Sequence, residues 1–105
     1  MTTPAAHEME DSSNCAVRLK ALSDPTRLAV MRRLARGAAT VTDLVEAFAV
    51  AQNLMSHHLK VLRDADLVVC QREGQCRRYA LAEGVLGRGA KVLKLGCCDI
   101  AFHQG

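Results

Sequence analysis

Residues 51–67, AQNLMSHHLKVLRDADL, decide the fold that this sequence predicts. At helical spacing, one side of the stretch is apolar and is expected to be buried: Leu54, Met55, His58, Leu59 and Leu62. The opposite side carries short polar and basic groups: Gln52, Asn53, Ser56, His57, Lys60 and Arg63. Amide side chains near a helix start can pair with adenine in the major groove, and basic side chains further along reach phosphates. The stretch therefore predicts a DNA recognition helix.

Another helix is predicted just before it, over VTDLVEAF at residues 41–48. Thr40 and Thr42 lie at its start, and Asp43 suits the first turn of a helix because of the helix dipole. A short break at Ala49 and Val50 separates the two helices. Two helices joined by a short turn, the second with an exposed polar face, are typical of a helix-turn-helix.

Two earlier helices are also predicted. Asp24 and Pro25 have the residue types of an N-cap and a first helical position, and Gly37 ends the helix that they begin. Its basic residues are expected mostly off its apolar stripe, facing solvent or a partner: Arg27, Arg32, Arg33 and Arg36. The first helix is predicted to begin at Cys15, with Asn14 or Ser13 as its cap.

After Leu67 the apolar pattern changes to that of a β-hairpin, with strands over 68–71 and 76–81 and a turn between them. Basic residues near its tip would hold the flanking DNA backbone or minor groove: Arg72, Arg77 and Arg78. Glu83 to about Phe102 is predicted to form a final helix, although its glycines make it a weak helix former. We therefore expect a mainly α winged helix-turn-helix with a small β-hairpin, dimeric through its first and last helices.

Length and composition bound the domain organisation. The 105 residues suffice for one domain, in which residues 1–14 are expected to form a flexible arm and residues 15–105 the folded body. The arm carries a net charge of −3 and the remainder +6, which is compatible with phosphate binding but also with solvated helix faces. The N-terminus resembles no signal peptide and no apolar run has the length of a membrane span, so a cytoplasmic protein without membrane contact is expected.

The chain has five cysteines, an odd number, and is expected to be intracellular, which argues against a disulfide framework. The absence of a C-x-x-C spacing argues against a zinc ribbon or a thioredoxin motif. Cys70 and Cys76 are interpreted as strand packing residues, with ligand or redox roles as alternatives. His57 and His58 are adjacent on a helix and point about 100° apart, so they cannot easily share a metal ion. We interpret His58 as a half-buried packing residue and His57 as a DNA contact.

Three stretches resemble the ArsR/SmtB family of bacterial metal-responsive repressors: LKALSDPTRLAVMRRL at 19–34, AQNLMSHHLKVLRDADLV at 51–68 and REGQCRRYAL at 72–81. The resemblance covers roughly residues 15–103. It implies a homodimer that binds operator DNA without effector and releases it when effector binds. It also implies that the recognition helix begins at the stretch with Gln52 and Asn53, and that the wing corresponds to 68–81.

The effector implied by this resemblance depends on which site type is present. The family's Cys-x-Cys site is missing from VTDLVEAF, and its Asp and His site on the last helix meets Glu83, Val85 and Gly96 instead. Cys97 and Cys98 resemble the vicinal cysteines of members that sense arsenic or antimony. As(III) prefers three sulfurs, and Cys15 from the partner subunit could supply the third, whereas methylated As(III) needs only two. No constitutive cofactor is expected.

Other interpretations remain open. Cys97 and Cys98 could be small packing residues at a helix end. The same repressor could instead sense oxidants or persulfides, with an intersubunit bond from Cys15 more plausible than a Cys97–Cys98 bond. A small thiol enzyme, such as an arsenical reductase, or a metallochaperone is the third reading. No acid–base constellation flanks the cysteines, and the sequence has no phosphate loop or C-x-x-C, so the chain is predicted not to be an enzyme.

Overall fold

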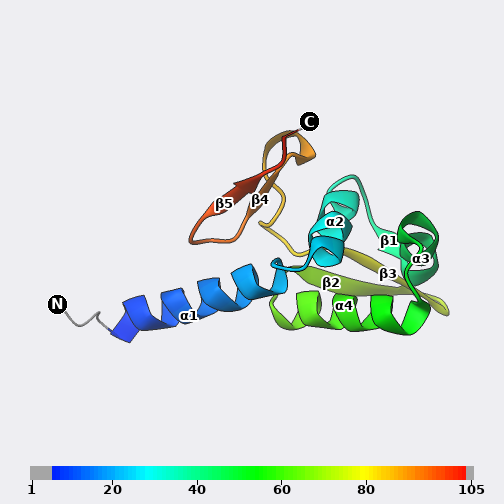
Figure 1. Ribbon diagram of the computed structural model, residues 1–105, viewed down its shortest axis with the longest axis horizontal. Helices are drawn as coiled ribbons and strands as arrows, with labels where there is room; N and C mark the ends of the chain where they lie inside the picture. Colours follow the sequence, from blue (N-terminus) through cyan, green and yellow to red (C-terminus); the bar gives the residue numbers. More distant parts are fainter. Residues whose placement is uncertain (1–5, 104–105) are drawn as a thin grey trace.

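The computed structural model describes residues 6–103 (Figure 1). Its helices are α1 (Ala6–Ala21), α2 (Pro25–Leu34), α3 (Val41–Phe48) and α4 (Gln52–Asp64). Its strands are β1 (Ala39–Thr40), β2 (Val68–Glu73), β3 (Cys76–Leu81), β4 (Val92–Lys94) and β5 (Asp99–Ala101), with a 3₁₀ turn, η1 (Arg88–Ala90), before β4. Over this range no helix has the length and hydropathy needed to cross a bilayer. The mainly α fold with a winged helix-turn-helix is confirmed.

The helix-turn-helix pair forms as its local sequence signals predict. The Thr40 hydroxyl accepts from the Asp43 backbone N–H at 3.1 Å, and the Asp43 carboxylate accepts from the Thr40 N–H at 3.0 Å. This reciprocal cap starts α3. Ala49 ends α3 in the left-handed conformation, with φ of 53°. The chain thereby reverses sharply and enters α4 two residues later.

The wing is the antiparallel hairpin β2–β3, whose turn contains Gly74 with φ of 61°. Only glycine adopts this conformation without a steric cost, which explains why the turn lies there. The sheet also contains β1, which pairs with β3 through Ala39 opposite Tyr79 and was not predicted from the sequence. A two-residue strand is too short to give an alternating pattern. It nevertheless ties the wing to the start of α3.

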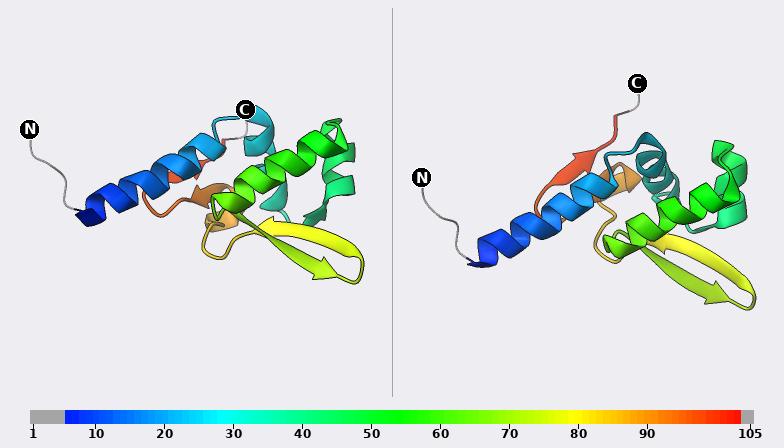
Figure 2. Two further views of the ribbon diagram at one scale, coloured as in Figure 1. Left: turned by 90° about the horizontal axis from the view of Figure 1, so that it is seen from below. Right: turned by 60° about the horizontal axis from the view of Figure 1, so that its bottom comes forward.

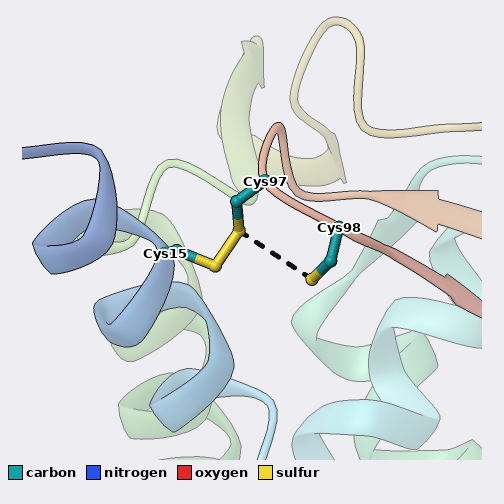
Figure 3. Close-up of side chains that lie close together, drawn as sticks. All are labelled: Cys15, Cys97 and Cys98. Atoms are coloured by element: carbon teal, nitrogen blue, oxygen red, sulfur yellow. Dashed lines mark hydrogen bonds between the residues drawn. A yellow bond between two sulfur atoms is a disulfide. The ribbon is translucent and has the colours of Figure 1, made fainter. Parts of the chain in front are cut away.

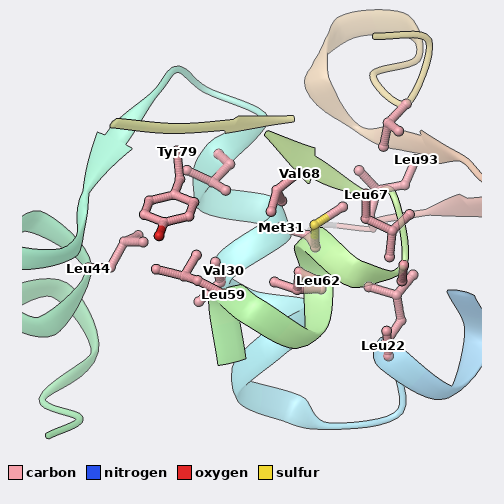
Figure 4. Packing of buried hydrophobic residues seen from close by; sticks show 14 of the residues in the cluster. Leu22, Val30, Met31, Leu44, Leu59, Leu62, Leu67, Val68, Tyr79 and Leu93 are labelled. Atoms are coloured by element: carbon pink, nitrogen blue, oxygen red, sulfur yellow. The ribbon is translucent and has the colours of Figure 1, made fainter. Parts of the chain in front are cut away.

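The core is aliphatic and lies between α2, α4 and the wing sheet (Figure 4). Its fully buried side chains include Val30, Met31, Leu44, Met55, Leu59, Leu62, Leu67, Val68, Leu93 and Leu95. The predicted inner face of α4 is confirmed except for Leu54, which is 47% exposed. Leu54 lies at the edge of the buried stripe, about 90° around the helix from its centre, whereas Met55 in the same turn is fully buried. The buried face thus positions the opposite, polar face of α4 toward solvent.

The start of α2 has the predicted cap. The Asp24 carboxylate accepts from the backbone N–H groups of Thr26 at 2.8 Å and Arg27 at 3.0 Å, and Pro25 takes the first helical position. The Arg27 N–H is the main reason that the pKa of Asp24 lies below its ordinary value of 3.8. The charged carboxylate is therefore the form that stabilises the helix start.

We expect Asp24→Ala to lower the free energy of unfolding by about 1 kcal/mol at neutral pH, the usual effect of removing a cap. A carboxyl whose folded pKa is lowered stabilises above its unfolded pKa, and this contribution is lost as the pH falls through the folded value. Chemical unfolding of both proteins from neutral pH downward should show the difference narrowing in acid. A difference that stays constant through the acid range would contradict this role.

The first helix begins earlier than predicted. It begins at Ala6 rather than near Cys15, so residues 6–14 of the expected flexible arm are helical, and residues 1–5 lie outside the described residues. The stretch AHEMEDSSN contains neither Pro nor Gly, and nothing in it interrupts the helix. α1 extends away from the rest of the molecule in Figure 1 and exposes apolar side chains, among them Met9, Val17 and Leu19.

The predicted final helix over residues 83–102 is wrong. This segment forms η1 and the hairpin β4–β5, with Leu93 opposite Ile100. Gly84, Gly89 and Gly96 have φ of 82°, 62° and 90°, which interrupts any helix there. Alternation along the extended chain instead buries Leu93 and Leu95. The predicted interface between the first and last helices is therefore not available in this form, because residues 83–102 of the described chain do not form the last helix.

Candidate functional site

The polar face of α4 is exposed as predicted. Gln52, Asn53, Ser56, His57, Lys60 and Arg63 are all solvent-exposed. The Asn53 side-chain oxygen accepts from the Leu54 backbone N–H at 2.9 Å, and Lys60 pairs with Asp64 at 3.1 Å across one helical turn. Both contacts are at the surface, where such interactions are weak and readily exchanged for a ligand. This face can therefore present its donors and acceptors to a partner.

The two adjacent histidines of α4 have different environments. His57 is exposed, whereas His58 is 6% exposed and its Nδ1 lies 3.2 Å from Arg27 Nη1. Arg27 also donates to the Ala21 carbonyl oxygen at 2.6 Å, so it joins α1 to α4 rather than facing solvent. Burial lowers the pKa of His58. A neutral His58 that packs in the core agrees with the sequence interpretation.

The wing carries its predicted arginines near the turn between β2 and β3. Arg72 and Arg77 are exposed cross-strand partners, and Arg78 donates to the Glu73 carboxylate at 3.3 Å. Two like charges directly opposite each other on a hairpin repel, and an external anion would relieve that repulsion. In both views of Figure 2 the hairpin projects alongside α4. The wing and the polar face of α4 can thus contact one extended polyanion.

Three cysteines come together in one chain, the adjacent pair Cys97 and Cys98 and the distant Cys15 (Figure 3). The sulfur atoms of Cys15, Cys97 and Cys98 lie within 4.8 Å of one another, and we call this set the thiol cluster. Cys15 and Cys97 form a disulfide with a Cα–Cα distance of 6.0 Å, and the Cys98 sulfur is 3.8 Å from that of Cys97. Cys97 and Cys98 lie in the β4–β5 turn rather than at a helix end, and Cys15 comes from the same chain rather than a partner.

Arg18 helps to hold the thiol cluster together, and the sequence analysis missed it. Its Nη1 donates to the Leu95 carbonyl oxygen at 2.6 Å, and its Nε approaches the Ala65 carbonyl oxygen at 3.4 Å. The guanidinium is also 3.3 Å from where a Cβ on Gly96 would lie. Its position three residues after Cys15, on the same helix face, was the available signal. Arg18 therefore fastens the β4–β5 turn to α1.

The donor set of the thiol cluster selects soft ions. Three thiolates without a coordinating carboxylate suit a thiophilic centre and disfavour hard cations such as Mg²⁺ or Ca²⁺. Cys97 and Cys98 are exposed and Cys15 is half-buried, so an ion can reach the sulfurs from solvent. Reduction of the Cys15–Cys97 bond is required before all three can bind. The cluster can thus act either as a ligand set or as a redox pair with a neighbouring thiol.

The two remaining cysteines lie on the wing, outside the thiol cluster. Cys70 is half-buried against the core, opposite Tyr79 on β3, as expected for a packing residue. Cys76 is exposed at the start of β3, so its interpretation as a packing residue is wrong. The strand begins at the turn, where no second layer covers it. Cys76 therefore provides a matched control thiol.

The polar helix and adjacent hairpin define a winged helix-turn-helix DNA-binding domain. A family profile described as a helix-turn-helix domain matches residues 22–71. The solution structure of the homodimeric winged helix-turn-helix domain Mb0332 from Mycobacterium bovis, a possible ArsR-family regulator, is similar at a TM-score of 0.71 and 27% identity, over 78% of this chain and 76% of that one. The crystal structure of RHA00566, an ArsR family transcriptional regulator, is similar at a TM-score of 0.62 and 34% identity, over 67% of this chain and 77% of that one.

Among curated proteins, the arsenical resistance operon repressor of Bacillus subtilis is 43% identical over 65 residues, which is 61% of this chain and 62% of that repressor. The chain belongs to the ArsR/SmtB family of transcriptional regulators. It spans 61–62% of the length of several curated relatives that it matches. The relatives described here are named as regulators of transcription, in agreement with the prediction that the chain is not an enzyme.

Proposed function

We propose that this protein is a cytoplasmic transcriptional repressor that binds operator DNA as a homodimer. The exposed polar face of α4 and the arginines of the wing supply base and phosphate contacts, and a relative of the same family is named as an operon repressor. The exposed apolar side chains of α1 favour pairing with a second copy through that helix, and the related domain Mb0332 is homodimeric. Two such domains would read half-sites about 34 Å apart.

We further propose that As(III), or the chemically similar Sb(III), is the effector. The observation that carries this is the convergence of three sulfurs within 4.8 Å in one chain. Reaction of arsenous acid with three thiols forms three As–S bonds and releases three waters, and no electrons are transferred. The resulting pyramidal centre suits soft donors in this number. The Bacillus subtilis relative is named an arsenical resistance operon repressor, which supports the same choice of effector.

Release of DNA follows if the ion favours the form that cannot bind the operator. Binding at the thiol cluster holds the β4–β5 turn against α1, the helix we assign to the dimer interface. A change in how α1 meets its partner alters the distance between the two recognition helices. The ion therefore has to bind the DNA-free form more tightly, and operator DNA must weaken ion binding by the same factor.

We expect Cys15→Ser to separate two kinds of arsenical. With only Cys97 and Cys98 left, affinity for inorganic As(III) should fall by roughly tenfold or more, because one As–S bond is lost. Methylated As(III) has only two exchangeable positions, so it should release the operator from this variant at nearly the same concentration as from the wild type. Gel shift on operator DNA under reducing conditions measures both, with Cys76→Ser as the control. If the variant lost its response to both arsenicals equally, Cys15 would not be the third ligand.

A second candidate is a thiol-based redox repressor, and the disulfide between Cys15 and Cys97 favours it. A peroxide would oxidise one thiolate to a sulfenic acid, and the other thiol would then displace water to form the disulfide. This bond lies within one chain, unlike the intersubunit bond expected from the sequence. In the same gel shift, peroxide without arsenical tests this candidate. Release by peroxide alone, but not by As(III) in reductant, would favour it over the metalloid sensor.

A further inference from the structure

A second cavity, away from the thiol cluster and from the polar face of α4, is lined by four basic side chains. It has a volume of about 310 Å³ and is lined by residues of α2, the last residue of α3, the end of η1 with Lys91, and Phe102. Its cationic side consists of Arg32, Arg33, Arg36 and Lys91. Its apolar side consists of Ala29, Phe48, Ala90 and Phe102. No carboxylate is among these lining residues, so no negative side chain in the lining would compete with a bound anion for the basic groups.

Two of the four basic groups make contacts within the fold. The Arg32 guanidinium lies 4.8 Å from the centre of the Phe102 ring, and Arg33 Nη1 donates to the Gly37 carbonyl oxygen at 3.1 Å. The salt bridges found within residues 6–103 are on α4 and the wing, so none engages these four side chains. The Asp43 carboxylate has only a small coulombic interaction with Arg33, and it accepts the Thr40 backbone N–H in the α3 cap. The positive charge of the cavity is thus not compensated by any of these ion pairs.

We propose that this cavity binds a small organic phosphate with a planar ring, the chemistry of a mononucleotide. Guanidinium groups pair with phosphate oxygens in a bidentate way, and Lys91 adds a point charge for a dianion. Phe48 and Phe102 line the apolar side and can contact a flat ring there. The volume lies at the lower end for small-molecule sites, which fits a ligand of this size.

Such a ligand would join parts of the chain that the thiol cluster does not. Ala90 and Lys91 precede β4, and the Phe102 backbone N–H donates to the Lys91 carbonyl oxygen at 2.7 Å. A bound phosphate would therefore hold the base of the β4–β5 hairpin against α2, while the opposite end of that hairpin carries Cys97 and Cys98.

Calorimetric titration of the reduced full chain with adenosine monophosphate tests the proposal, with inorganic phosphate as a second probe. At about 0.15 M salt, where surface charges are screened, the nucleotide should bind more tightly than inorganic phosphate. Arg36→Glu should weaken nucleotide binding roughly tenfold or more. Phe102→Ala should reduce the nucleotide to the affinity of inorganic phosphate. Arg88→Glu, an exposed reversal outside the lining, should leave both unchanged.

Any one of four results would overturn the proposal. The nucleotide could fail to bind the wild type at millimolar concentration, or it could bind Arg36→Glu equally well. The nucleotide and inorganic phosphate could also bind with equal affinity, unaffected by Phe102→Ala. This result would show that the site does not recognise a planar ring. Finally, Arg36→Glu could weaken operator DNA and not the nucleotide, which would make this surface a DNA backbone contact. None of these results bears on release by As(III), so the effector proposal is tested separately.

Discussion

Replacing both Cys97 and Cys98 by serine is expected to abolish operator release by As(III) while leaving operator affinity within about twofold. A single remaining thiolate, Cys15, cannot hold a centre that prefers three sulfurs, and serine oxygens are poor ligands for a soft ion. Loss of two of three As–S bonds should raise the As(III) concentration needed for half-maximal release by about 100-fold or more. Release is therefore abolished at the concentrations that act on the wild type. The measurement is a gel shift or anisotropy titration on the chain's own upstream DNA, in reductant.

Two controls separate ligand loss from damage to the fold. Cys76→Ser removes an exposed wing thiol and should respond to As(III) as the wild type does. Each single variant, Cys97→Ser and Cys98→Ser, should be intermediate, because each keeps two of the three sulfurs. If the double variant released DNA at the wild-type As(III) concentration, the thiol cluster would be rejected as the effector site.

The second large effect is expected at the start of α4. Gln52→Ala with Asn53→Ala should remove base contacts, each worth about 1–3 kcal/mol of discrimination, so operator affinity should fall by roughly tenfold to a hundredfold per contact. Affinity for unrelated DNA should change little, because phosphate contacts dominate there. Lys60→Ala should behave differently: it should weaken both kinds of DNA alike and lower the salt slope by about one.

The comparison needs operator and scrambled duplexes titrated at several salt concentrations. Gln52 and Asn53 are exposed, and their replacement leaves the buried face of α4 intact, so unfolding is not a competing explanation. Arg88→Ala, on η1, serves as a surface control. If the Gln52 and Asn53 variant lost affinity for both duplexes to the same extent, α4 would not read the sequence, and its role as a recognition helix would be wrong.

Local signals explain why the helix-turn-helix and wing were predictable. Asp24 with Pro25, the Thr40 and Asp43 pair, and the apolar spacing of α4 each act within one or two helical turns. The same holds for the β2–β3 hairpin, whose strands adjoin one glycine-containing turn. The exposure of Leu54 was not predicted, because apolar spacing locates the centre of a buried face better than its edge, where Leu54 lies.

The C-terminal segment shows the limit of apolar spacing as a signal. Val85, Leu93 and Leu95 read equally well as a helical stripe or as buried positions of an extended chain. The glycines at 84, 89 and 96 counted against the helix, and all three have positive φ in the folded chain. The spacing of apolar residues alone therefore could not distinguish a helix from an extended chain in this segment.

The sequence by itself determined a winged helix-turn-helix with a polar recognition face, and it identified Cys97 and Cys98 as the pair to test. Only the tertiary structure decided that Cys15 joins them in the same chain, that Arg18 fastens the β4–β5 turn to α1, and that four basic groups line a cavity beside α2. The physical reason is range. Caps, turns and amphipathic faces arise from neighbours a few residues apart, whereas Cys15 and Cys97 are 82 positions apart and meet only because the hairpin packs on α1.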